Sequence, residues 1–330
     1  MNIKWIKNIN YRLIEWQKRK MHSVVIGYPY WLTIDPCNAC NLKCVFCPTG
    51  QDRNTRTKAM LSFDNFKKMI DKIGPYLIHI DFCNWGEPLL NKEIFKMIEY
   101  VQKYLLVTKV DTNLNVEMDV ADAIKLISSG LDRLNVSLDG ASQETYGVYR
   151  RNGSFEKVVQ NVKTLVEIRR NLNAKKPHMH WQFLVFKHNE HEIEKARKMA
   201  NEIGFDSIGF TAPFCAIEWA PNNEDYNRYV VKENQVNFKT ADLQCEWPWD
   251  GITINADGSV SPCCSVEDEK DDFGNILTKG FWRIWNGRDY RKARKYIRDR
   301  KALKEGNVCT RCDHIGSSNH TKVVYNEQYR

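Results

Sequence analysis

Long apolar runs are missing from this 330-residue sequence. No stretch approaches the ~20 apolar residues that a transmembrane helix needs, and the N-terminus has no apolar core followed by a small-residue cleavage site. We therefore expect a cytoplasmic protein whose eleven cysteines are kept reduced. Metal binding or catalysis then explains these cysteines better than a disulfide network, and their odd number agrees with that.

A concentrated basic surface is missing as well. The net charge is +8, but Lys and Arg are spread along the chain and are not grouped with stacking aromatic residues. The one dense run, residues 288–304, alternates with apolar residues at helical spacing, which indicates a solvated helix face. We predict no nucleic-acid partner.

The first 30 residues form a basic, amphipathic segment. Ile6, Ile9, Leu13 and Trp16 share one face of a predicted helix, with Lys and Arg elsewhere. Such a helix can rest on a membrane surface or on a partner. We favour the simpler interpretation that it packs across the domain.

The middle of the chain alternates between short β-rich segments and amphipathic helical segments. The expected strands are WLTID, LIHIDF, VTKVDT, RLNVSLD, HWQFLVF and SIGFTA, and the helices between them span residues 62–73, 91–104, 119–129, 154–172 and 191–203. This α/β pattern predicts parallel strands with right-handed crossovers, hence a partial (βα)6 TIM-like barrel, with an open doubly wound sheet as the alternative.

Polar and reactive residues follow these strands where each one ends. They are the clustered cysteines after the first strand, NWGEP after the second, Thr112 and Asn113 after the third, Ser137 and Asp139 in the fourth, and Cys215 after the sixth. Because the carboxyl ends of parallel strands lie at one edge, the pattern predicts a single active site there.

Four cysteines lie within CNACNLKCVFC, residues 37–47. Cys40, Cys44 and Cys47 form a CxxxCxxC pattern, while Cys37 lies apart at the strand end. Three thiolates on a 4Fe-4S cluster leave one iron open to a substrate or cofactor. A zinc site is the alternative, but structural zinc takes four closed ligands, commonly from two CxxC pairs, and the spacing fits it poorly.

This CxxxCxxC pattern, with Phe46 before its last cysteine and directly after the first strand of a predicted partial barrel, resembles the radical S-adenosylmethionine (radical SAM) enzymes. In that family the open iron is chelated by S-adenosylmethionine, which is cleaved by one electron to a 5'-deoxyadenosyl radical that takes a hydrogen atom from the substrate. The resemblance implies that Cys40, Cys44 and Cys47 hold the cluster and that Phe46 packs against the adenine.

WGEP at residues 85–88 is similar to the family's GGE element. Trp85 stands where a glycine is usual, Gly86 would allow close backbone approach, and Glu87 would receive the methionine ammonium group.

NVSLDG resembles the family's fourth-strand element. The resemblance implies that Ser137 contacts the cofactor's ribose or carboxylate and that Asp139 faces the substrate side. Asn113 is placed similarly, and Arg150 would meet the methionine carboxylate, with a surface arginine as the alternative.

The C-terminal third carries a second set of cysteines. Cys245 precedes GITINADGSVSPCC, in which a DG turn predicts a β-hairpin that brings Cys245 and Cys263 together, and CTRC then supplies Cys309 and Cys312. Four such thiols can close a zinc site or a 4Fe-4S cluster, and their spacing does not choose. The arrangement resembles the twitch module, a shortened SPASM domain, which implies one auxiliary 4Fe-4S cluster.

The chain is thereby divided into five parts. These are a basic N-terminal segment (1–30), the partial barrel (31–215), a linker (216–244), a small α+β auxiliary-cluster module (245–315) and a tail (316–330).

Four cysteines remain unassigned. We expect Cys37, Cys83 and Cys264 to be small buried hydrophobes. Cys215, near the barrel mouth, could return a hydrogen atom to a substrate radical as a cysteine does in related epimerases, although we favour a packing role.

The auxiliary cluster indicates the net reaction, because it can accept a second electron from a substrate radical. Single-cluster relatives include an aminocyclitol (2-deoxy-scyllo-inosamine) dehydrogenase with similar cysteine spacing. We predict an oxidoreductase for a polar small molecule (a sugar, cyclitol or sugar conjugate) that uses S-adenosylmethionine, two 4Fe-4S clusters and a reducing partner such as flavodoxin or ferredoxin. The alternatives are a peptide-modifying enzyme, an epimerase and a non-catalytic iron-sulfur electron-transfer protein.

Overall fold

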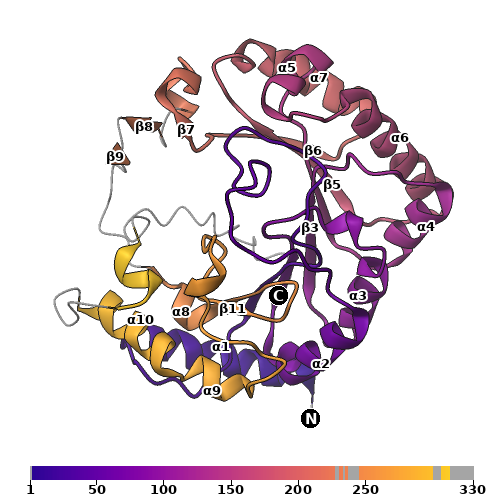
Figure 1. The fold of residues 1–330 in the computed structure, drawn as a ribbon. Coiled ribbons are helices and arrows are strands. Elements are labelled where there is room, and N and C mark those ends of the chain that lie inside the picture. Colours follow the sequence, from indigo (N-terminus) through magenta and orange to yellow (C-terminus); the bar gives the residue numbers. More distant parts are fainter. Residues whose placement is uncertain (1, 227–229, 233–234, 237–244, 300–305, 313–330) are drawn as a thin grey trace.

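A curved sheet of eight strands, with helices on its outer face, organises the molecule (Figure 1). The computed structural model describes residues 2–226, 230–232, 235–236, 245–299 and 306–312. The strand order is β11-β10-β1-β2-β3-β4-β5-β6. The six predicted strands are β1 (Trp31–Ile34), β2 (His79–Phe82), β3 (Val107–Thr112), β4 (Arg133–Ser137), β5 (His178–Leu184) and β6 (Ser207–Thr211), each parallel to its neighbour.

Helices connect these strands in the order that the sequence predicts. They are α2 (Phe63–Ile73), α3 (Ile94–Val101), α4 (Val120–Ser128), α5 (Gln143–Tyr149), α6 (Phe155–Asn171) and α7 (Ile193–Ile203), of which α5 is an addition to the five predicted. Ser62, Asp119 and Ser154 cap the N-termini of α2, α4 and α6 with their side-chain oxygens. The prediction of a partial TIM-like barrel is confirmed.

Each barrel strand presents different chemistry to its two faces. In β4, Leu134 and Val136 are fully buried in the core between sheet and helices, and Arg133, Asn135 and Ser137 alternate with them, on the opposite face. The same period of two holds in β2, β3 and β5. The helix side of the sheet is therefore apolar, and the concave side is polar.

The C-terminal hairpin joins the barrel sheet. Its strands β10 (Gly251–Ile254) and β11 (Val260–Ser261) are antiparallel around Gly258, whose φ of +84° suits glycine. The hairpin is thus confirmed, but β10 also pairs in parallel with β1, so it extends the barrel by two strands. The flanking helices are α8 (Trp247–Asp250), α9 (Phe281–Trp285) and α10 (Arg288–Arg298).

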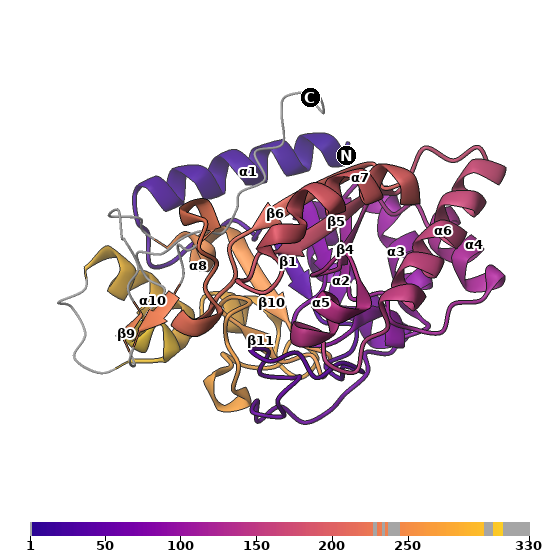
Figure 2. The same ribbon diagram turned by 90° about the horizontal axis from the view of Figure 1, so that it is seen from above.

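The N-terminal helix α1 (Ile3–Arg19) lies across the domain, against α8 and the turn at Gly74–Tyr76 (Figure 2). The expectation that it packs on the domain is therefore confirmed. Among the described residues, no helix combines the length and apolar character needed to cross a membrane.

The predicted linker is described in part, and the predicted tail lies outside the described residues. Short strands β7 (Cys215–Ala216), β8 (Val230–Lys232) and β9 (Gln235–Val236) lie at or within residues 215–244. Residues 227–229, 233–234, 237–244 and 313–330, which include the predicted tail, lie outside the described residues. The boundaries of the five parts stay a prediction.

Candidate functional site

The cysteine loop and the WGEP turn are packed backbone to backbone. A Cβ at Gly86 would lie 1.7 Å from the carbonyl oxygen of Cys37, so no other residue fits there without moving the loop. The amide of Glu87 donates to Ala39 O at 2.8 Å. The two motifs, which lie 38 or more positions apart in the sequence, therefore form one unit at the carboxyl ends of β1 and β2.

Glu87 joins the ends of β2 and β3. Its buried carboxylate accepts from Thr112 Oγ1 at 2.6 Å, from the amide of Asn113 at 2.7 Å and from the amide of Leu89 at 3.0 Å. Burial raises the pKa of Glu87, although these three donors lower it in part. Its role in receiving an ammonium group stays a prediction.

Asn113 links this carboxylate to the thiols. Its side-chain amide lies 3.6 Å from Cys40 Sγ and donates to Asn41 Oδ1 at 3.1 Å. The backbone amide of Asn113 donates to Glu87, so the position of Asn113 depends on both the cysteine loop and the WGEP turn.

The three thiols of the CxxxCxxC loop lie close enough to influence one another. Burial raises the pKa of Cys40 to about 12, and the neighbouring charges of Glu87, Cys44 and Cys47 add to the effect. Thiolates so placed need a cation to balance them, and the iron of a cluster supplies one. The donor set therefore fits a three-cysteine iron-sulfur cluster.

Arg150 borders this thiol set. Its Nη1 lies 3.8 Å from Cys44 Sγ, and its Nε donates to Asp139 Oδ2 at 2.5 Å. Burial opposes the guanidinium charge, but the charges of Asp139 and Cys44 outweigh it, so the pKa of Arg150 is raised. Arg150 is thus a buried, ion-paired residue; contact with a cofactor carboxylate stays a prediction. Ser137, the last residue of β4, is half-buried, and its contact with the cofactor stays a prediction.

An aromatic cluster closes the outer side of the cysteine loop. Phe46 packs edge-on against Trp219 at 5.1 Å between ring centroids, and Tyr149 and Phe186 continue the cluster. Cys215 is buried in the same cluster, where burial raises its pKa to about 11. These contacts support a packing role for Cys215, and hydrogen donation stays a prediction.

The interior of the barrel carries a charged row that the strand-end pattern does not predict. Lys109 lies between two carboxylates, 3.2 Å from Asp81 Oδ1 and 2.9 Å from Asp111 Oδ2. Asn135 donates to Asp111 at 2.7 Å from the next strand. The alternation of polar residues within HIDF, VTKVDT and RLNVS is the sequence signal for this row, because every second side chain of a strand points to the same face.

Cys83 and Cys264 have charged neighbours, whereas the sequence predicts small hydrophobic residues at both positions. Cys83 is half-buried and donates to Asp111 Oδ2 at 3.1 Å. Burial raises the pKa of Cys264 to about 11, and Asp81 adds to the effect, so Cys264 lies near the charged interior of the barrel. Cys37 is buried as expected.

The second cysteine set surrounds a cavity of about 250 Å³. Cys263, Cys309 and Cys312 line it, together with Asp271 and Arg311. Burial raises the pKa of Cys309, and Cys245 and Cys312 contribute to the rise, which places Cys245 close by. The fold thus brings together the four thiols that the sequence predicts as auxiliary-cluster ligands.

No three Cys, His, Asp or Glu side chains within the described part of the chain converge tightly enough to share a single metal ion.

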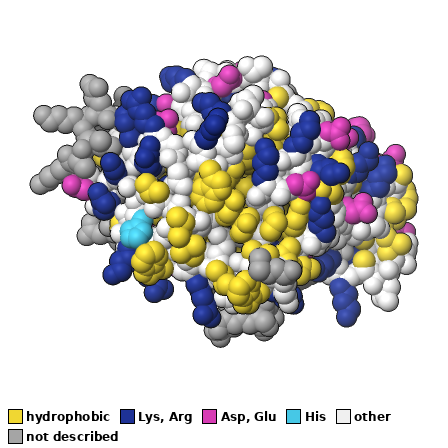
Figure 3. All heavy atoms as spheres, turned by 90° about the horizontal axis from the view of Figure 1, so that it is seen from below, with side chains coloured by type: hydrophobic (Ala, Val, Ile, Leu, Met, Phe, Trp, Pro, Cys, Tyr) yellow, Lys and Arg dark blue, Asp and Glu magenta, His cyan; other side chains and the backbone are white. Residues whose placement is uncertain are grey.

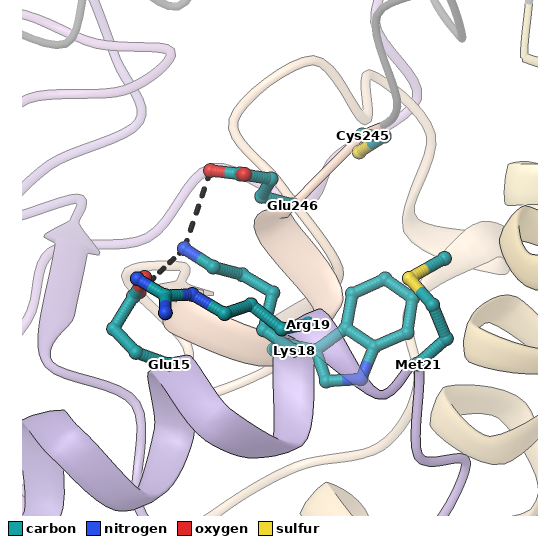
Figure 4. A pocket seen from close by; sticks show the side chains of 7 residues that line it. Glu15, Lys18, Arg19, Met21, Cys245 and Glu246 are labelled. Carbon is teal, nitrogen blue, oxygen red and sulfur yellow. Dashed lines mark hydrogen bonds and ion pairs between the residues drawn. The ribbon is translucent and has the colours of Figure 1, made fainter.

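Cys245 also borders a second cavity, of about 190 Å³, beneath α1. Figure 4 shows Lys18 of that helix between Glu15 and Glu246, the residue that follows Cys245. The N-terminal helix therefore contacts the segment that carries Cys245 and leads into α8.

The two cysteine sites are joined through buried polar contacts that the sequence did not reveal. Arg56, which follows the cysteine loop, forms a two-pronged ion pair with Asp272 at 2.8 and 2.9 Å. Trp85 Nε1 donates to Val266 O at 2.9 Å. Trp85, at the position of a usual glycine, thus ties the barrel to the C-terminal module.

Two family models match the chain. The model of the radical SAM superfamily matches residues 34–200, and that of SPASM, an iron-sulfur cluster-binding domain, matches residues 245–313.

Curated relatives carry several activities. The GTP 3',8-cyclase of Desulforamulus reducens is 27% identical over 139 residues, 42% of this chain and 43% of the relative. The mycofactocin maturase of Mycolicibacterium smegmatis is 29% identical over 154 residues, which are 47% of this chain and 37% of the relative. The probable GTP 3',8-cyclase of Methanocaldococcus jannaschii is 27% identical over 284 residues, and the match covers 76% of this chain and 89% of the relative. The chain spans less than half the length of the first curated relatives that it matches.

Solved structures share the fold. Streptococcus suis SuiB bound to S-adenosylmethionine has a TM-score of 0.61 at 14% identity, covering 85% of this chain and 70% of that one. The structure of anSMEcpe with AdoMet and a peptide has a TM-score of 0.56 at 17% identity, covering 86% of each chain.

Proposed function

Because the chain belongs to the radical SAM superfamily and carries a SPASM module, we propose that it oxidises a small polar substrate held inside the barrel. Its cofactors are S-adenosylmethionine and 4Fe-4S clusters. When bound, they supply reductive cleavage of S-adenosylmethionine to a 5'-deoxyadenosyl radical, which abstracts a hydrogen atom.

The residues of the cysteine unit hold and orient these groups in the proposal. Cys40, Cys44 and Cys47 ligate the catalytic cluster. Asn113 and Arg150 lie against Cys40 and Cys44, where an amide and a guanidinium can donate to a cofactor carboxylate. Glu87 fixes the strand ends that carry them.

The polar interior of the barrel supports a substrate rich in hydroxyl or amino groups. Asp81, Lys109 and Asp111 form a charged row across β2 and β3. The two carboxylates are also paired with other protein groups, which are Trp31 and His79 for Asp81 and Cys83 and Asn135 for Asp111. These paired charges make the interior wall polar, and a polar wall suits a ligand that carries hydrogen-bonding groups. A sugar, a cyclitol or a sugar conjugate, as in the aminocyclitol dehydrogenase type, has this chemistry.

The position of Cys263 and Cys264 carries the proposal of a net oxidation. Cys263 lines the auxiliary cavity, and its neighbour Cys264 lies near Asp81 in the barrel interior. In the proposal, a substrate in the interior would lie near Cys263, one of the residues that would hold the auxiliary cluster, and such a cluster would supply an acceptor for the second electron. A carboxylate of the interior row, Asp81 or Asp111, would take the proton released from the substrate's hydroxyl or amino group.

A peptide-modifying enzyme is the second candidate. The similarity to a mycofactocin maturase, 29% identical over 154 residues, favours it. An epimerase would return a hydrogen atom to the substrate and leave its oxidation state unchanged. In each case a reducing partner such as flavodoxin or ferredoxin supplies the first electron.

Fractionated extract can test the proposed substrate class. The reconstituted, reduced protein is incubated without oxygen with the small-molecule and peptide fractions of a cell extract, and 5'-deoxyadenosine is measured. Stimulation by the small-molecule fraction, with a product that has lost two hydrogens, supports the proposal. Stimulation by the peptide fraction alone, or a product of unchanged mass, contradicts it.

A further inference from the structure

Helix α1 packs on the domain through polar residues. Its buried side chains are those of Lys7, Asn10, Ile14, Gln17 and Lys18. Asn10 pairs with both backbone groups of Tyr28, and Lys7 Nζ donates to Leu105 O at 3.0 Å. This is the reverse of an ordinary surface helix, which buries its apolar face.

Ion pairs secure this polar side. Lys18 contacts Glu15 at 2.5 Å and Glu246 at 3.3 Å (Figure 4). It also contacts Asp250 at 3.0 Å. Gln17 accepts from the amides of Ile26 and Gly27. The helix is therefore held in place without using its outward side.

The outward side of α1 is apolar. Trp5, Ile9 and Trp16 are 58%, 45% and 51% exposed, and their spacing of four and seven residues places them in one row. Val24 and Ile26, which follow the helix, are 50% and 69% exposed. We call these five residues the α1 face. Figure 3 views the molecule from below Figure 1 and shows hydrophobic side chains gathered on that face, with Lys and Arg around them.

The charges beside the α1 face have one sign. In residues 2–30, the exposed charged side chains are those of Lys4, Arg12, Arg19 and Lys20. The one acidic residue in this segment, Glu15, is half-buried and bonded to Lys18 and Tyr30. Tryptophan and aliphatic residues flanked by Lys and Arg are the composition of helices that lie in the interface of anionic bilayers.

We propose that the α1 face docks the protein on an anionic membrane surface, with α1 parallel to it. A second copy of the chain fits less well, because a twofold interface would oppose the same basic residues to each other. From the sequence alone, packing on the domain and resting on a membrane are alternative roles for the N-terminal helix. The structure assigns the two roles to opposite sides of one helix.

Vesicle co-sedimentation tests the proposal on the full-length, cluster-loaded protein. Vesicles of phosphatidylcholine alone are compared with vesicles that also contain phosphatidylserine. We expect binding to the anionic vesicles. This binding should weaken at high salt, because the Debye screening length falls to about 3 Å at 1 M salt. The double variant Trp5→Ser/Trp16→Ser should lose it. Its control, Leu172→Ser, removes an exposed apolar side chain from the far end of α6 and should bind as wild type.

A charge variant gives an independent readout. Arg12→Gln/Arg19→Gln/Lys20→Gln should weaken binding by about fivefold for each charge removed, while Lys163→Gln on α6 should not. Unchanged iron content and melting temperature verify that each variant is folded. Absence of binding by the wild type overturns the proposal, as does equal binding of the Trp double variant. A wild-type dimer that the Trp variant converts to a monomer, without vesicle binding, assigns the face to a second copy and also overturns it.

Discussion

Arg150 donates through Nε to the fully buried carboxylate of Asp139, at 2.5 Å. Asp139 also accepts from the amide of Leu184 at 2.7 Å, so the pair ties the end of β4 to the end of β5. Through Nη1, Arg150 then reaches Cys44 of the cysteine loop. One ion pair thus connects the barrel wall to the thiols.

The substitution Asp139→Asn should destabilise the protein by about 3 kcal/mol, because it leaves a buried guanidinium without its partner. The measurement is the melting temperature of the anaerobic protein. Glu194→Gln, which removes an exposed partner of Arg197, serves as the control and should have no measurable effect. An equal melting temperature for Asp139→Asn and wild type would show that the pair is dispensable.

The substitution Gly86→Ala should prevent assembly of the catalytic cluster. The new Cβ cannot lie 1.7 Å from Cys37 O, so the cysteine loop must move. We expect loss of about half of the iron of a protein with two 4Fe-4S clusters, measured by iron analysis after reconstitution. Gly280→Ala is the matched control, since nothing lies within 4 Å of its added Cβ. Full iron content in Gly86→Ala would refute the close packing of the two motifs.

Asp35 should make stability depend on pH. Burial raises its pKa to about 7, partly opposed by the amides of Trp85 and Gly86, and its Oδ1 has no hydrogen-bond partner of normal geometry. Between the pKa of Asp35 in the unfolded chain, near 4, and its pKa in the folded protein, near 7, only the folded protein holds the proton. The free energy of unfolding therefore falls as the pH rises through this range. Above pH ~7 the whole cost of burying the charged carboxylate is present.

The substitution Asp35→Asn removes this cost. We expect the variant to exceed wild type by about 1 to 3 kcal/mol at pH ~8 and the difference to shrink toward pH ~5. Melting temperatures across this range provide the measurement, and Asp64→Asn, an exposed carboxylate, is the control. A difference that grows toward low pH would have the wrong sign for a buried carboxyl with a raised pKa.

The substitution Asp111→Asn should impair substrate recognition without impairing S-adenosylmethionine cleavage. It removes the negative charge that pairs with Lys109, Cys83 and Asn135 in the barrel interior. We expect at least a tenfold higher substrate concentration for half-maximal 5'-deoxyadenosine release, and unchanged release without substrate. Asp225→Asn, on the surface, should match wild type. An unchanged substrate dependence would exclude this row from the substrate site.

The six barrel strands and their helices could be predicted because each repeats a short-range pattern, an apolar strand followed by an amphipathic helix. The pairing of β10 with β1 could not, since Trp31 lies opposite Gly251 and nothing in either segment encodes so distant a neighbour. The spacing of the cysteines marks both sets in the sequence, and their role as cluster ligands stays a prediction. The contact of Arg56 with Asp272 was missed for the same reason as the strand pairing.

The orientation of α1 shows a second limit of sequence patterns. Periodicity located the helix and its apolar face, but it could not tell which face is buried. Lys18 finds Asp250 only in the folded chain, and such partners allow polar residues to pack inward.

The division of labour between the two cysteine sites is the central claim, and two sets of alanine variants test it most directly. The variant Cys40→Ala/Cys44→Ala/Cys47→Ala should release no 5'-deoxyadenosine. The variant Cys309→Ala/Cys312→Ala should still release it but form no oxidised product. Release by the first variant, or full oxidation by the second, would contradict the assignment of radical generation to the barrel loop and of the second electron to the C-terminal site.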